Sequence, residues 1–178
     1  MRIISGSFKG RRFQLPNNLK ARPTTDFAKE SLFNILQNIT DIEDCTALDL
    51  FAGTGSIGLE FVSRGAKQVT CVEQYTPHIS FIRSVAEKLK VNNLLLVKGD
   101  VYQYISKCGR QFDIVFADAP YADPRLGKIP ALVFQANLLK SGGWLVVEHS
   151  NHNDFSQEPH FKELRKYGSV HFSFFQAE

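Results

Sequence analysis

The chain has 178 residues, of which 43% are hydrophobic and 22% are charged, and its formal net charge is +3. This length fits a single domain over residues 1–178, and the composition excludes a repetitive, low-complexity or largely disordered protein. No apolar stretch is long enough to cross a bilayer, the N-terminus lacks the apolar core of a signal peptide, and the three cysteines show no zinc-ligand spacing, so we expect a cytoplasmic protein without a metal.

The N-terminal end is strongly basic, because residues 1–30 carry seven basic and only two acidic side chains. Residues 2–5 and 12–15 have the pattern of two short strands around a pair of glycines, which predicts a small β-hairpin. Basic side chains interleaved with Phe8 and Phe13 suit contact with a phosphate backbone. A solvated basic hairpin without a partner is the plainer alternative.

A helix is predicted next, because Thr24 or Thr25 can cap a segment whose apolar residues recur at helical spacing. Those apolar residues are Ala28, Leu32, Ile35, Leu36 and Ile39. We expect the hairpin and this helix to form an appendage over residues 1–40, beside a core that spans residues 45–178.

From residue 46 onward, short apolar segments alternate with helical ones. The predicted strands are residues 47–50, 69–73, 94–98, 113–117 and 144–148. The predicted helices are residues 56–64, 77–91, 101–107 and 126–139. Such alternation predicts parallel strands joined by right-handed crossovers.

The last part of the chain predicts how the sheet ends. Gly142 and Gly143 are expected to turn into the last parallel strand, and residues 161–167 and 170–175 have the pattern of a β-hairpin. We therefore predict an α/β protein with a doubly wound, mostly parallel, seven-stranded Rossmann-like sheet that has an antiparallel hairpin at its edge.

A glycine-rich turn predicts a nucleotide cofactor. Gly53, Gly55 and Gly58 satisfy the GxGxxG pattern after a predicted strand and at the start of a helix. Glu73 ends the next strand, where its carboxylate can accept hydrogen bonds from both hydroxyl groups of a ribose. Nicotinamide dinucleotides and S-adenosylmethionine both use this arrangement, and glycines that only form a tight turn are the alternative.

Acidic residues around this turn favour a cationic ligand. Asp49 lies in the first strand, where an acid would be unfavourable beside a pyrophosphate but suits the amino-acid end of S-adenosylmethionine. Phe51 belongs to the same turn. After the third strand, Asp100 can accept from an adenine amino group and Val101 can donate through its backbone, although Asp100 is equally suited to capping a helix.

The tetrapeptide Asp-Ala-Pro-Tyr at residues 118–121 follows a predicted strand, whose end should face the same crevice as the glycine turn. An exocyclic amine on a base is a poor nucleophile, because its lone pair is delocalised into the ring. The Asp118 carboxylate and the Ala119 carbonyl could each accept one N–H and so aim the lone pair at a methyl donor. Pro120 would restrain the loop and Tyr121 would stack on the base. Taken alone, the segment is also compatible with an ordinary Asp-Pro turn.

Several segments of this sequence occur together in one known family. They are RIISGSFKGRRFQLP, RPTTDFAKESLFNIL, LDLFAGTGSIGLE, VEQ, GDV, FADAPY and GGWLVVEHS. Through these segments, nearly the whole chain resembles the bacterial 16S ribosomal RNA guanine-N2 methyltransferases of the RsmD type. The resemblance implies a class I S-adenosylmethionine-dependent methyltransferase that modifies 16S ribosomal RNA, free or within an assembling small subunit, and a monomer is expected.

The resemblance also implies roles for individual residues. Residues 118–121 match the family's catalytic Asp/Asn-Pro-Pro-Tyr/Phe tetrapeptide, with Ala119 in place of the usual first proline. Residues 22–25 would help to cover the cofactor. The expected cofactor-binding residues are then Arg22, Thr24, Thr25, Asp49, Phe51, Gly53, Gly55, Glu73, Asp100 and Val101. The expected RNA-binding residues are Lys9, Arg11 and Arg12.

Three other functions stay open from the sequence. The same tetrapeptide serves adenine-N6 methyltransferases acting on DNA or another RNA, although their usual recognition domain has no room in this length. A nicotinamide-dependent oxidoreductase would need a substrate domain. A non-catalytic RNA-binding relative is the third alternative, because Ala119 departs from the family's tetrapeptide.

Overall fold

The structure is a computed structural model that describes residues 1–16, 19 and 25–178. The strands of its sheet are β1 (Thr46–Leu50), β2 (Gln68–Glu73), β3 (Leu94–Lys98), β4 (Phe112–Ala117), β5 (Leu139–His149), β6 (Phe161–Tyr167) and β7 (Val170–Gln176). The helices are α1 (Asp26–Ile39), α2 (Ser56–Ser63), α3 (Thr76–Leu89), α4 (Val101–Lys107) and α5 (Ile129–Gln135), with a 3-10 turn, η1 (Leu126–Lys128), before α5.

The sheet has the predicted topology. Its strands lie in the order β3-β2-β1-β4-β5-β7-β6, and the pairs from β3 to β5 are parallel. Strand β7 pairs antiparallel with both β5 and β6, which confirms the predicted hairpin at the edge. In a parallel sheet all carboxyl ends lie on one edge, so the loops after β1, β2, β3, β4 and β5 share a single rim.

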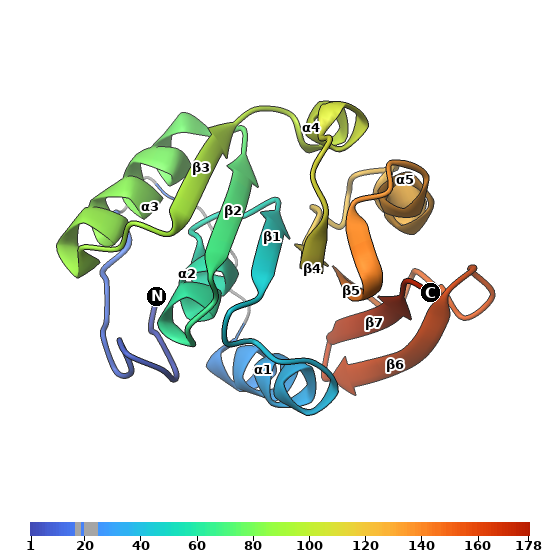
Figure 1. The fold of residues 1–178 in the computed structure, drawn as a ribbon, viewed down its shortest axis with the longest axis horizontal. Helices are drawn as coiled ribbons and strands as arrows, with labels where there is room; N and C mark the ends of the chain where they lie inside the picture. The colour runs from blue at the N-terminus through green and yellow to red at the C-terminus, as the bar shows by residue number, and fades with distance from the viewer. Residues whose placement is uncertain (17–18, 20–24) are drawn as a thin grey trace.

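Helices cover both faces of this sheet (Figure 1). On one face, apolar side chains of α1, α2 and α3 pack in a cluster with inward-facing residues of the strands. On the other face, α4 and α5 do the same. Both faces are therefore buried, which explains why the parallel strands read as continuous apolar runs and not as alternating ones.

Helix α1 begins where the sequence predicts. The Thr25 hydroxyl accepts the backbone N–H of Ala28 at 3.1 Å and so satisfies one of the unpaired donors of the first turn. Of the predicted apolar residues, Ala28, Leu32 and Leu36 are buried, whereas Ile35 and Ile39 are partly exposed at the rim of the core.

The predicted helix over residues 126–139 is wrong in extent. The chain forms η1 and then α5, which has Pro130 in its first turn, where a missing N–H does no harm. The helix ends at Gln135, because Asn137 adopts a left-handed backbone with φ of 51°. Leu139 already belongs to β5.

The glycine pair at 142–143 also behaves differently from the prediction. Both glycines lie inside β5, where Leu139 pairs with Phe112 and Trp144 pairs with Ile114. The intervening residues bulge outward, and a side chain at Gly143 would come within 2.9 Å of the Lys140 carbonyl. The strand is therefore longer than predicted and contains a bulge at its beginning.

The two short N-terminal strands reduce to one antiparallel bridge between Arg2 and Arg12. Three backbone hydrogen bonds surround this bridge, from Phe13 N to Met1 O, from Ile3 N to Arg11 O and from Gly10 N to Ile3 O. Elsewhere in this segment, the Ile4, Ser5 and Phe8 N–H groups donate to side chains of α2, and the Ser7 N–H donates to the Ser63 carbonyl. In the described part of the chain, no helix has the length and apolar character needed to span a membrane.

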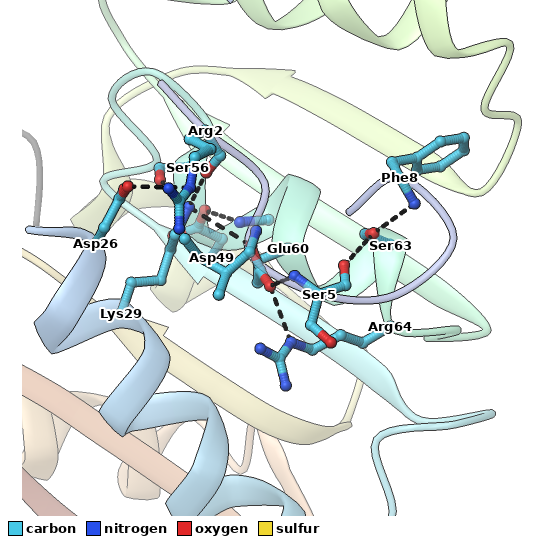
Figure 2. A network of polar contacts seen from close by, with 12 residues as sticks. Arg2, Ser5, Phe8, Asp26, Lys29, Asp49, Ser56, Glu60, Ser63 and Arg64 are labelled. Carbon is cyan, nitrogen blue, oxygen red and sulfur yellow. Dashed lines mark hydrogen bonds and ion pairs between the residues drawn. The ribbon is translucent and has the colours of Figure 1, made fainter. Parts of the chain in front are cut away.

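A buried ionic network attaches the N-terminal segment to the core (Figure 2). The fully buried Glu60 carboxylate accepts backbone N–H bonds from Ile4 and Ser5, both at 2.9 Å, and a third bond from Arg64 Nε at 2.9 Å. Lys29 of α1 places its Nζ 3.5 Å from the same carboxylate. The network therefore joins α1, α2 and the N-terminal segment at one point.

Lys29 makes two further bonds within this network. Its Nζ donates to the Arg2 carbonyl at 2.5 Å and to the Ser56 hydroxyl at 3.0 Å. Burial lowers the pKa of Lys29 below its usual value, and the nearby Glu60 and Asp26 carboxylates oppose that shift. Because Ser56 is the first residue of α2, the ammonium group ties the N-terminal segment to the start of the helix that follows the glycine turn.

Candidate active site

The three motif glycines of the turn after β1 have different roles. A side chain at Gly58 would overlap the Cys71 sulfur, and one at Gly55 would come within 2.8 Å of Ile82. Both glycines therefore allow α2 to pack closely on the sheet and on α3. At Gly53, where φ is 54°, the nearest atom to an added side chain is 3.9 Å away, so this is the position at which a ligand can approach the backbone.

Phe51 is held in a strained conformation at the start of this turn. Its φ is 63°, a left-handed value that a bulky residue rarely adopts, and it directly follows β1. Its ring packs edge-on against Tyr102 of α4, with the ring centroids 5.6 Å apart. Strain of this kind is commonly retained where a functional loop must be shaped.

Glu73, at the end of β2, orders the same turn. One carboxylate oxygen accepts the Gly53 N–H and the other accepts the Tyr75 N–H, both at 2.8 Å. The His78 ring lies 3.6 Å from the first oxygen. Since each carboxylate oxygen has two acceptor sites, this arrangement fits a ribose whose hydroxyl groups donate to Glu73.

Asp49 lies beneath the turn and not on its surface. It is 1% exposed, and its carboxylate accepts the Gly58 N–H at 2.8 Å and lies 3.9 Å from the Cys71 sulfur. Burial is the main cause that raises the pKa of Asp49 to about 7. Direct contact with a cofactor stays a prediction for this residue, whose visible role is to hold α2 against β1.

Replacement of Asp49 by asparagine is expected to change how stability depends on pH. The native carboxyl keeps its proton up to about pH 7, whereas the unfolded chain releases it near its ordinary value of 3.8. Between these values the native state binds more protons, so this group makes the wild type less stable as pH rises. The amide can still accept from Gly58 but does not titrate.

The measurement is urea unfolding of both proteins from about pH 4 to about pH 8. The free energy of unfolding of the variant, relative to that of the wild type, should rise across this range by roughly 1.4 kcal/mol for each unit of pKa shift. A constant difference between the two proteins would show that Asp49 titrates normally.

The loop after β3 lies on the same rim, and β2 separates β3 from β1 in the sheet. Asp100 caps α4, because its carboxylate accepts the Gln103 N–H at 2.9 Å, which confirms the predicted capping role. Val101 is buried in the first turn of that helix. Capping orders the two residues that are expected to meet adenine, and that contact stays a prediction.

Three residues that the sequence did not single out connect this loop to the one after β4. Asp123 accepts from the Tyr102 hydroxyl at 3.2 Å and from the Arg125 guanidinium at 3.0 Å. The same guanidinium stacks over the Tyr102 ring, 3.8 Å from its centroid. None of the three belongs to a recognisable motif, so only their contacts reveal them.

The predicted tetrapeptide lies next to the glycine turn. The Asp118 N–H bonds the carbonyl of Leu50, the last residue of β1, at 3.3 Å. Ala119 is fully buried among the apolar residues beneath the loop. Pro120 is exposed, and its carbonyl accepts the Asp123 N–H at 2.8 Å, which closes the loop into a turn. Asp118 therefore bonds to Leu50, which precedes Gly53 by three positions in the chain, and both loops lie on the shared rim.

Tyr121 and Glu148 meet at the outer side of this loop. The Tyr121 ring is 36% exposed, and its hydroxyl lies 3.4 Å from a carboxylate oxygen of Glu148. Glu148 lies near the carboxyl end of β5 and is only 3% exposed. The sequence pattern predicts Glu148 only as the end of a strand, and its one signal is an acidic residue directly after a run of apolar ones.

The remaining predicted site residues lie away from these contacts or outside the described part of the chain. Arg22 and Thr24 are outside the described residues, whereas Thr25 caps α1. Lys9, Arg11 and Arg12 are all exposed on the N-terminal segment. Among residues 1–16, 19 and 25–178, no three His, Cys, Asp or Glu side chains are grouped to hold a metal ion.

Comparisons with known proteins agree along nearly the whole chain. A family model described as "Conserved hypothetical protein 95" matches residues 1–176. The "Ribosomal RNA small subunit methyltransferase D" of Buchnera aphidicola subsp. Baizongia pistaciae is 32% identical over 179 residues, which cover 98% of this chain and 91% of that protein. The protein of the same name from Escherichia coli is 35% identical over 83% of this chain and 71% of its own length. The solved "Putative methyltransferase yhhF" from Escherichia coli has a TM-score of 0.88 and 29% identity, and the match covers 100% of this chain and 98% of that one.

Proposed function

Because the chain belongs to the family described as Conserved hypothetical protein 95, in common with the ribosomal RNA small subunit methyltransferases that it resembles, we propose that it methylates ribosomal RNA. In this proposal the methyl donor is S-adenosylmethionine and the acceptor is the exocyclic N2 amine of a guanine in 16S ribosomal RNA. The observation that carries the proposal is the bond from Asp118 N to Leu50 O, because it sets the tetrapeptide beside the glycine turn.

The donor fits the residues around the turn. Gly53 leaves space where a side chain would stand, Glu73 has an ordered carboxylate that could accept from ribose hydroxyl groups, and Asp100 at the start of α4 could accept from the adenine. When bound, S-adenosylmethionine supplies an electrophilic methyl group.

The chain's own residues would act mainly by positioning the amine. The Asp118 carboxylate and the Ala119 carbonyl each accept one N–H of the amine, which turns its lone pair toward the glycine turn. Tyr121 stacks on the flipped base and holds it in the crevice. Orientation of this kind removes much of the entropic cost of bringing two reactants together, so no strong base is required.

The exposed basic residues of the N-terminal segment would bind the RNA backbone. Lys9, Arg11 and Arg12 lie on a segment that the Glu60 network fixes against α2, so their positions relative to the crevice are set by the core. Contacts to phosphate position a nucleic acid without reading its sequence. The choice of nucleotide would then depend on the crevice itself.

The test is methyl transfer from labelled S-adenosylmethionine to unmethylated small-subunit RNA, free and within subunits, followed by mapping of the modified base. We expect one N2-methylguanine in 16S ribosomal RNA. A methyl group found on an adenine would favour the adenine-N6 alternative. If no methyl group is transferred to free RNA and none to subunits, the proposal is wrong.

A further inference from the structure

Strands β4 and β5 bring two acidic residues to the same part of the rim. The last aligned pair between these parallel strands is Ala117 with Val147, and Asp118 and Glu148 follow directly. Aligned residues of neighbouring strands point to the same face of a sheet, and the next residues in both chains point to the opposite face. Asp118 and Glu148 are therefore neighbours on one face, at the ends of adjacent strands.

Glu148 lies beside Tyr121, the residue that is proposed to stack on the base. Its carboxylate is 3% exposed and lies 3.4 Å from the hydroxyl of Tyr121, the residue whose ring would stack on the base. A carboxylate can accept hydrogen bonds from several donors at once, so contact with the tyrosine is compatible with a further donor.

The edges of guanine and adenine differ at the point where a second carboxylate would act. Guanine presents two adjacent donors, the N2 amine and N1–H, whereas in adenine the atom next to the exocyclic amine is an acceptor. Two neighbouring carboxylates can accept from both donors of guanine, whereas one of them would repel the acceptor atom of adenine. The N1 lone pair of adenine would face a negative charge.

We propose that Glu148 accepts the N1–H of the target base while Asp118 accepts from its N2 amine, and that Glu148 thereby selects guanine over adenine. This inference rests on the proposed function and assigns its base specificity to one residue. Tyr121 would stack on the base beside it.

The experiment compares guanosine with 2-aminopurine riboside at the mapped target position of reconstituted small subunits. 2-Aminopurine keeps the amine that accepts the methyl group but has an acceptor at N1. The wild type should prefer guanosine in kcat/KM by about tenfold to a hundredfold, the range of one good base contact. In Glu148→Gln the side-chain amide can donate to N1 of 2-aminopurine, so the preference should fall to nearly one.

Tyr121→Phe is the matched control, because it removes the hydroxyl contact to Glu148 and keeps both the ring and the carboxylate. It should retain the wild-type preference for guanosine, whatever its overall rate. If Glu148 only anchors the tyrosine, Glu148→Gln and Tyr121→Phe will slow both substrates alike and leave the ratio unchanged. That result would overturn the inference while the proposed function stands.

A second measurement uses the wild type alone and so does not depend on the folding of a variant. Subunits with inosine at the target position keep N1–H but lack the amine, and they should inhibit at a concentration at least about tenfold lower than subunits with adenosine there. Equal inhibition would also overturn the inference. If the wild type transfers no methyl group to guanosine in the first place, the proposed function itself fails.

Discussion

Replacement of Asp118 by alanine is expected to abolish detectable methyl transfer, a loss of at least about a hundredfold to a thousandfold in kcat. In the proposed mechanism this carboxylate accepts from the target amine, and without it the lone pair is no longer directed at the methyl donor. Binding of S-adenosylhomocysteine should change little, because Gly53, Glu73 and Asp100 belong to other loops. Transfer is measured with labelled donor and cofactor affinity by calorimetry.

Asp118→Asn provides the matched comparison. Asparagine has nearly the same shape and keeps one acceptor oxygen, but it carries no charge and its other terminal atom is a donor. It should retain more activity than alanine and bind the cofactor equally well. Wild-type turnover in Asp118→Ala would contradict the assigned mechanism, and parallel loss of cofactor affinity would show that the residue shapes the whole crevice.

Replacement of Glu60 by alanine is expected to have the largest effect on stability. The change leaves the ammonium of Lys29, which is 1% exposed, without its buried carboxylate, and it removes the acceptor for the Ile4 and Ser5 N–H groups. Breaking a buried ion pair from one side typically costs about 3–5 kcal/mol. Urea unfolding gives the change in the free energy of unfolding.

Two further variants identify the cause of this loss. Glu163→Ala removes a partly exposed partner of Arg165, whose guanidinium lies 2.6 Å from the carboxylate, and should change stability by no more than about 1 kcal/mol. Combining Glu60→Ala with Lys29→Met removes the unpaired charge and should recover part of the loss. If the double variant is no more stable than Glu60→Ala, the charge is not responsible.

Local signals were sufficient to predict most of the fold. The cap at Thr25 and the strands from β1 to β4 follow from capping chemistry and from apolar runs, and the structure confirms them to within two residues. The bulge in β5 could not be predicted, because a glycine pair has the same appearance in a turn and in a bulge. Only the pairing with β4 distinguishes the two.

The site was predicted less completely, for a different reason. Motif spacing identified Gly53, Glu73 and Asp118, which the structure places on one rim. Asp49 was expected at the crevice but is buried, because alternation along β1 points its side chain toward α2. Glu148 and the Arg125–Tyr102 stack depend on contacts between strand ends that are distant in sequence, so no local pattern announces them.

The opposite edge of the sheet offers a position for attaching a label. The catalytic candidates lie where the parallel strands finish, whereas Gly109 belongs to the connection that leads into the beginning of β4 and has open space around it. A fluorophore or a surface tether attached through a cysteine at this position, with the partly exposed Cys108 replaced by serine, would leave the rim with Gly53 and Asp118 facing solution. Single molecules could then be used to test the proposed binding of small-subunit RNA.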